Sequence, residues 1–283
     1  MDDVESPSPQ GEVEGATAPL PITTEPSNDT TQQTYAKVVT YIAIPGSWEG
    51  RADPSRPSFT PPDLKPGQIA YITKGTRIAW SGTARLERLP SGDVVKTPHF
   101  DPDRRYYEAH CQDMRLEARI YDAVGAHPRY LENGSLKEYI SANSGSLTPQ
   151  LRRRWARQAS EGLGALHAAG VIHCDISPRN FLRDGDLCLK IADFGGGSLN
   201  GSAPSAVAGT RFRYPVSDWD APARFEEDVF GLGSLIYFIM SLAMRSRTFP
   251  DVTELACGDI ITRCWGMQVS AAEVHAYFEA LDG

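Results

Sequence analysis

The stretch that decides the fold is V-I-H-C-D-I-S-P-R-N-F-L at 171–182, together with D-F-G at 193–195. Between them lie two short strand-like runs joined by a tight turn. Such a hairpin would bring Asn180 and Asp193 to neighbouring positions, with Asp175 in the same loop as Asn180. Mg²⁺ prefers oxygen ligands, so converging side chains of this kind suit a magnesium–phosphate centre.

The two strings resemble the catalytic loop H-x-D-x-x-x-x-N and the metal-binding D-F-G of eukaryotic-type protein kinases. The resemblance implies that Asp175 orients the attacking hydroxyl and accepts its proton. It also implies that Asn180 and Asp193 hold Mg²⁺ beside ATP. Acids that cap turns are common in loops, but the joint match at the family's own separation favours the functional interpretation. The chain also resembles short kinase-like proteins of filamentous fungi.

The first half of the chain carries a partial nucleotide-binding region. The string V-V-K that ends at Lys96 resembles the third-strand V-A-x-K of the family, which implies that Lys96 holds the α- and β-phosphates and that Glu117 pairs with it. A solvated lysine and an exposed helix face are the alternatives for these two residues. Gly82, Val94 and Leu182 are the other residues that the resemblance assigns to the nucleotide.

Several residues depart from the family pattern. Ala79, Ser81 and Ala84 stand at the glycine positions of the phosphate-covering loop. Cys174 replaces the arginine that binds a phosphorylated activation loop, so we expect activity to be independent of such phosphorylation. Ser177 replaces the lysine typical of Ser/Thr kinases, which leaves the substrate hydroxyl class open.

The connection between the two halves is unusually short. Residues 129–131 alone separate Pro128, which resembles the loop after the small-lobe helix, from Glu132, which resembles the start of the hinge. Two strands and their turn need about 12 residues. The sequence therefore predicts that two strands of the family's small lobe are missing.

Hydrophobic periodicity gives the remaining elements. Gly125 is expected to cap a helix over 103–124, and Thr148 to begin another that ends at Gly170. Asp228, near the start of a buried central helix, is expected to cap the catalytic loop from inside. The other runs read as strands at 69–73, 76–80, 83–89, 93–97, 180–183 and 187–191, and as helices from about 226 and at 258–265 and 270–281.

These elements predict an α+β, two-lobed, protein-kinase-like fold with a small β-rich N-lobe lacking two strands and a larger helical C-lobe. Residues 1–67 are predicted to be a disordered acidic, Pro-rich tail and linker. A truncated N-lobe is expected over 68–132 and the C-lobe over 133–283. The segment 35–44 could add a strand to the small-lobe sheet.

Composition limits the partners. The net charge is −8, but the acidic excess lies mainly in residues 1–33, so the remainder offers no basic surplus for nucleic acid. The five cysteines form no C-x-x-C pair, which favours free thiols in a reducing compartment. The apolar stretch at 229–244 is too short for a membrane span. We therefore expect an intracellular protein, cytoplasmic or nuclear, with a protein substrate and without a nucleic-acid or membrane partner. The oligomeric state stays open.

The resemblance implies a protein kinase that uses ATP and Mg²⁺ to phosphorylate a protein hydroxyl, on Ser or Thr rather than Tyr. One alternative is a pseudokinase that uses its large lobe as a binding module. Another is an inactive, truncated gene product. A small-molecule phosphotransferase, which shares the H-x-D-x-x-x-x-N logic, is a third.

Overall fold

The computed structural model describes the chain with several gaps. The described residues are 40–45 (backbone only), 63–66, 68–81, 83–125, 131, 133–215, 218, 221–242 and 250–282. The predicted disordered leader before residue 40, the predicted nucleotide contact Gly82, and the hinge residue Glu132 all lie outside the described residues.

Two strands near the start of the described chain form a small parallel sheet. β1 (Thr40–Pro45) pairs with β2 (Gln68–Thr73), with Thr40 opposite Gln68. The expected strand at 35–44 therefore exists over its second half. It belongs to this two-stranded sheet and not to the neighbouring three-stranded one.

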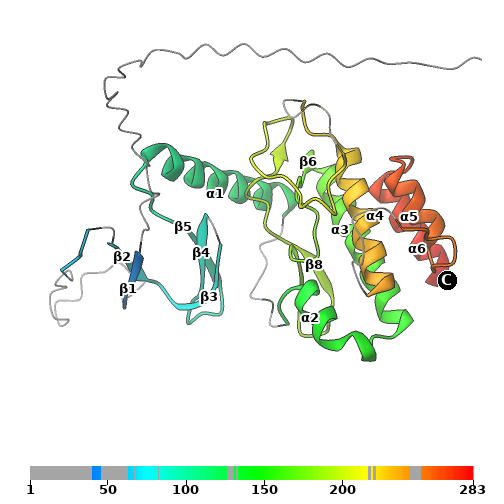
Figure 1. The fold of residues 1–283 in the computed structure, drawn as a ribbon, viewed down its shortest axis with the longest axis horizontal. Coiled ribbons are helices and arrows are strands. Elements are labelled where there is room, and N and C mark those ends of the chain that lie inside the picture. The colour runs from blue at the N-terminus through cyan, green and yellow to red at the C-terminus, as the bar shows by residue number, and fades with distance from the viewer. Residues whose placement is uncertain are drawn as a thin grey trace, which may run out of the picture. The chain divides into compact units, whose positions relative to one another are not determined.

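The three-stranded sheet is antiparallel and carries one long helix. Its strands are β3 (Thr76–Trp80), β4 (Ala84–Arg88) and β5 (Val94–Pro98), in that order. Helix α1 (Arg104–Val124) packs against β5 (Figure 1). Gly125 ends the helix in the left-handed region at φ 74° and donates its N–H to the Tyr121 carbonyl, as a C-terminal capping glycine does.

The chain then passes to the helical part. Helix α2 (Leu136–Asn143) follows, with the short 3-10 helix η1 (Ser144–Ser146) after it. Among the described residues between α1 and α2 there is no strand, only an isolated bridge from Ser135 to Leu182. Residues 126–130 and 132 lie outside the described residues, so the predicted loss of two strands stays a prediction.

Four helices enclose the main core. They are α3 (Pro149–Ala168), α4 (Phe225–Ser241), α5 (Gly258–Trp265) and α6 (Ala271–Asp282). Helix α3 lies beside both α4 and α6, and α4 lies beside α5 (Figure 1). Trp155, Leu163, Leu235 and Phe278 are fully buried between them. Burial of a large apolar side chain stabilises the fold by about 1.5–3 kcal/mol. These helices therefore form the stable part of the C-lobe to which the loops at 173–180 and 192–197 are attached.

Two short hairpin-like pairings shape the functional loops. β6 (Val171–Ile172) pairs with β9 (Ser198–Leu199), and β7 (Phe181–Arg183) pairs with β8 (Leu189–Ile191). We call residues 173–180 the catalytic loop and residues 192–197 the metal loop, after their sequence resemblance. The fold is a mixed one, with a small sheet-containing N-lobe and a helical C-lobe, as predicted. Within the described residues, no helix combines the length and apolarity that crossing a bilayer requires.

Candidate active site

The catalytic loop is held closed by its own side chains. Asn180 Nδ2 donates to the Asp175 carbonyl at 2.8 Å and to Asp175 Oδ2 at 2.9 Å. The Asp175 N–H lies 3.3 Å from His173 Nδ1, and His173 Nε2 lies 3.1 Å from the Ala192 carbonyl. A neutral imidazole that accepts at Nδ1 and donates at Nε2 satisfies both contacts. These bonds fix the position of the Asp175 carboxylate. They use the Nδ2 atom of Asn180, so the amide oxygen Oδ1 of Asn180 can still bind a ligand.

The metal loop is tied directly to the catalytic loop. The Ala192 N–H donates to the Asn180 carbonyl at 2.9 Å, just beyond the β7–β8 ladder. Asp193 follows in the left-handed region at φ 68°, which a non-glycine residue adopts only where the surroundings hold it. Burial raises the pKa of Asp175, and the negative charge of Asp193 raises it further, against the opposing Asn180 hydrogen bond. The backbone bond from Ala192 to Asn180 therefore holds the two loops together.

Lys96 joins the two lobes at this point. From β5, its Nζ donates to Glu117 Oε2 at 2.8 Å and to Asp193 Oδ1 at 2.5 Å. Burial alone would lower the pKa of Lys96, but the carboxylates of Glu117 and Asp193 outweigh burial and raise it. The lysine therefore stays cationic at neutral pH. The Glu117 side chain is 8% exposed and that of Asp193 is 57% exposed, so one pair is internal and the other faces solvent.

Aromatic contacts set the position of α1 relative to both loops. Tyr121 lies one helical turn after Glu117 and meets the Phe194 ring edge-on at 5.0 Å. Phe194 in turn meets His173 edge-on at 5.5 Å. Burial raises the pKa of Tyr121. These two edge-on contacts connect α1, the metal loop and the catalytic loop. They therefore help to hold Glu117 of α1 near Lys96.

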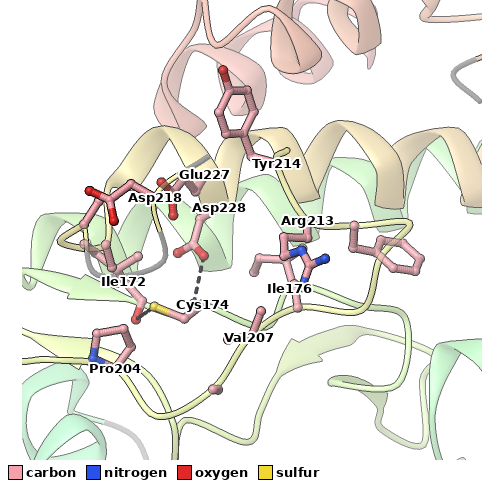
Figure 2. Close-up of a pocket in the computed structure, with 15 residues that line it drawn as sticks. Ile172, Cys174, Ile176, Pro204, Val207, Arg213, Tyr214, Asp218, Glu227 and Asp228 are labelled. Atoms are coloured by element: carbon pink, nitrogen blue, oxygen red, sulfur yellow. Dashed lines mark hydrogen bonds between the residues drawn. The ribbon is translucent and has the colours of Figure 1, made fainter. Parts of the chain in front are cut away.

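A buried carboxylate holds the backbone of the catalytic loop by hydrogen bonds. Asp228, at the start of α4, accepts the N–H groups of His173 at 2.7 Å and Cys174 at 2.9 Å. It also lies 3.2 Å from His167 Nε2. Figure 2 shows the bond to Cys174 as a dashed line. Cys174 has φ 64°, and Asp228 compensates for this strained backbone. This is the internal cap that the sequence predicts for Asp228.

A small cavity of about 110 Å³ adjoins Cys174, between the catalytic loop and the segment that contains Arg213 and Tyr214 (Figure 2). Burial, with the charge of Asp228 adding to it, raises the pKa of the Cys174 thiol to about 12. The thiol is therefore neutral at pH 7. It cannot replace the arginine that the resembled family carries there, and it is a poor nucleophile.

The donor set fits Mg²⁺. Asn180 can offer its amide oxygen and Asp193 its solvent-facing carboxylate, and both are the hard oxygen donors that Mg²⁺ prefers. No group of three or more His, Cys, Asp or Glu side chains suited to a metal occurs among the described residues. Two protein ligands completed by water and phosphate oxygens are the usual arrangement for Mg²⁺, so the pair suffices.

The structure thus brings Lys96, Glu117 and Asp193 into one cluster and joins Asp175 to Asn180. The remaining described candidates occupy strands: Val94 begins β5 opposite Arg88, and Leu182 lies in β7. Neither Tyr121 nor His173 was given a role from the sequence. The position of Tyr121 could have been inferred, since residues four apart share one face of a helix.

Comparison with known proteins agrees with this geometry. Residues 127–264 match the family model described as a protein kinase domain. The cytoplasmic tyrosine-protein kinase BMX of Homo sapiens is 34% identical over 135 residues, which cover 44% of this chain and 19% of that protein. The receptor-like protein kinase HSL1 of Arabidopsis thaliana is 30% identical over 212 residues, covering 63% and 20%.

A bacterial relative gives a similar result. The serine/threonine-protein kinase PknL of Mycobacterium tuberculosis is 29% identical over 194 residues, covering 62% of this chain and 48% of PknL. The chain therefore spans less than half the length of each of these relatives. Their names include both tyrosine and serine/threonine kinases. Residues 127–264 therefore resemble a protein kinase domain, and the relatives that match this chain are protein kinases.

Proposed function

We propose that this chain is an ATP- and Mg²⁺-dependent protein kinase that phosphorylates Ser or Thr hydroxyls of an intracellular protein substrate. The observation that carries the proposal is the double contact of Lys96 with Glu117 and Asp193. An exposed surface lysine would not be bridged between a buried carboxylate and a metal-loop carboxylate. A cation held in this way suits the binding of nucleotide phosphates.

Each charged group has a separate task in this proposal. Lys96 binds the α- and β-phosphates, and Glu117 holds the lysine in place. Asn180 and Asp193 hold Mg²⁺, which neutralises charge on the phosphoryl oxygens. Asp175 orients the substrate hydroxyl and takes its proton, and its raised pKa brings it closer to a working general base. Positioning and electrostatics supply most of the rate in phosphoryl transfer, so these contacts matter more than any covalent chemistry.

The test is transfer of label from [γ-³²P]ATP by the full chain, with Mg²⁺, to a mixture of acidic, neutral and basic proteins. Asp175→Asn is the matched control, because it keeps the side-chain volume and removes the base. We expect label on Ser and Thr after acid hydrolysis, with none for the control. Label on Tyr alone would overturn the hydroxyl class. Label on small alcohols alone would indicate a small-molecule phosphotransferase.

A second candidate is a binding module without catalysis. It is favoured by the sequence-based expectation that two small-lobe strands are missing between Pro128 and Glu132. Thermal unfolding with ATP, with and without Mg²⁺, separates the two candidates from an inert chain. Stabilisation by nucleotide without any transfer would support the binding module. Absence of both would contradict the kinase proposal.

A further inference from the structure

The loop that follows the metal loop folds back onto helix α1. Ser205, an exposed residue, donates its hydroxyl to Asp113 Oδ1 at 2.7 Å. Asp113 lies one turn before Glu117 on α1, and residues four apart occupy the same helix face. One hydrogen bond therefore connects this loop to the helix face that presents Glu117 to Lys96.

The backbone of the metal loop places Ser205 for this contact. The Gly196 carbonyl accepts the N–H groups of Ser205 at 3.0 Å and Ala206 at 2.9 Å. A Cβ on Gly196 would collide with Ala206, so the approach requires glycine. A Cβ added to Gly195 would point toward Glu117 Oε2 and Asp113, so this side of Gly195 faces α1. The metal loop is thus enclosed between α1 on one side and residues 205–206 on the other.

The usual cationic site for a loop phosphate is altered in this chain. Cys174 stands beside Asp175, and its half-buried thiol is neutral at pH 7. The Ser205 hydroxyl provides a different link between the loop and α1. This link uses no phosphate, and it would be lost if Ser205 gained one, because a phosphate and the Asp113 carboxylate repel each other.

We propose that the Ser205–Asp113 hydrogen bond is a latch that positions α1, and with it Glu117, without phosphorylation of the loop. Ser205 and Asp113 are positioning residues, since they act through Glu117 and Lys96. An anion at Ser205 opens the latch, so modification of this serine switches the site off. The effect on activity rests on the proposed kinase function, whereas the effect on α1 does not.

The first measurement is amide hydrogen exchange of the full chain, followed by mass spectrometry of α1 peptides. Loss of one exposed hydrogen bond to a carboxylate, in Ser205→Ala, is expected to speed α1 exchange about fivefold. Ser205→Thr keeps the hydroxyl and should match the unaltered chain. Ser205→Glu should exchange faster still, and Asp113→Asn in the same chain should restore part of the protection because it removes the repulsion.

A matched control separates the latch from general loosening of the loop. Val207 is exposed in the same loop, and Val207→Ala should leave α1 exchange unchanged. Peptides from α3 and α6 should exchange alike in all variants, which shows that each variant is folded. Equal α1 exchange in the unaltered chain, Ser205→Ala and Ser205→Glu would overturn the proposal.

The second measurement is steady-state kinetics with ATP as the varied substrate, which gives KM and kcat separately. An opened latch should raise the KM about fivefold in Ser205→Ala, with recovery in Ser205→Thr. If no variant transfers phosphate but α1 exchange responds as described, the latch stands and the kinase function fails. If the unaltered chain transfers phosphate and Ser205→Ala changes neither exchange nor KM, the latch fails and the kinase function stands.

Discussion

Replacing Lys96 with Met tests whether the ion-pair cluster is formed in solution. The Lys96 side chain is 20% exposed and the Glu117 side chain 8%, so this pair is largely internal. Removing one partner of a fully buried pair costs about 3–5 kcal/mol, because the other charge stays behind without compensation. The partial exposure of Lys96 reduces that to about 2–3 kcal/mol. The contact with the 57% exposed Asp193 adds less than about 1 kcal/mol.

The reverse replacement, Glu117→Met, should cost a similar amount, because it leaves a partly buried lysine. The double variant Lys96→Met/Glu117→Met removes both charges and replaces them with apolar groups of similar length. Such replacement of an internal pair is close to neutral. We therefore expect the double variant to be more stable than either single one. Two single costs of about 2–3 kcal/mol and a nearly neutral double variant give a coupling energy of about 4–6 kcal/mol.

Urea unfolding followed by tryptophan fluorescence measures these differences. With a slope of about 2–3 kcal/mol/M, each single variant should unfold at a urea concentration lower by about 1 M. Phosphate transfer should be lost in all three variants, since each lacks the cation or its support. A double-variant cost that equals the sum of the two single costs within about 0.5 kcal/mol would contradict the ion pair, because the side chains would then not be in contact.

Asp175→Asn should lower phosphate transfer by about 10²–10⁴-fold. It should leave the urea midpoint at pH 7 unchanged or higher. The pKa of Asp175 is higher in the folded than in the unfolded chain, so ionisation of this carboxyl above its ordinary pKa of 3.8 destabilises the fold, and asparagine removes that cost. The transfer rate of the unaltered chain should fall as pH decreases through that raised pKa, above the ordinary value of 3.8, and a pH–rate profile checks this. Asp228→Asn should lower the free energy of unfolding by about 3 kcal/mol, measured in urea. It replaces one of the two acceptor oxygens with an NH2 donor, so one of the two backbone N–H groups loses its acceptor.

Local rules account for the elements that the sequence predicted well. Thr148 caps α3, Pro149 occupies its first turn, and Gly125 ends α1. Each of these signals lies within a few residues of the boundary that it marks. Helix α2 was missed although Ser135 and Glu138 form a capping box at its start, because the helix is short and its apolar pattern weak. Pairing of β6 with β9 involves only two residues on each side and has no local signal.

The candidate site also has a part that sequence motifs could predict and a part that they could not. Asp175, Asn180 and Asp193 were proposed from their spacing in two short motifs, and Lys96 and Glu117 from a strand motif and a helix. The structure joins Lys96 to Glu117 and Asp193, and Asp175 to Asn180. The direct bond from Lys96 to Asp193 was not foreseen, nor was that from Ser205 to Asp113. Both bonds join residues far apart in the sequence, and their geometry depends on how α1 and the metal loop pack. No periodicity or composition encodes such a contact.

The central claim is that Asp193 and Asn180 form a magnesium–nucleotide site with Lys96. Calorimetric titration of the full chain with ATP, with and without Mg²⁺, tests it most directly, with Asp193→Asn as the comparison. We predict that Mg²⁺ tightens ATP binding at least tenfold, or about 1.4 kcal/mol, and that Asp193→Asn removes this gain. Equal ATP affinity with and without Mg²⁺ in the unaltered chain would contradict the account.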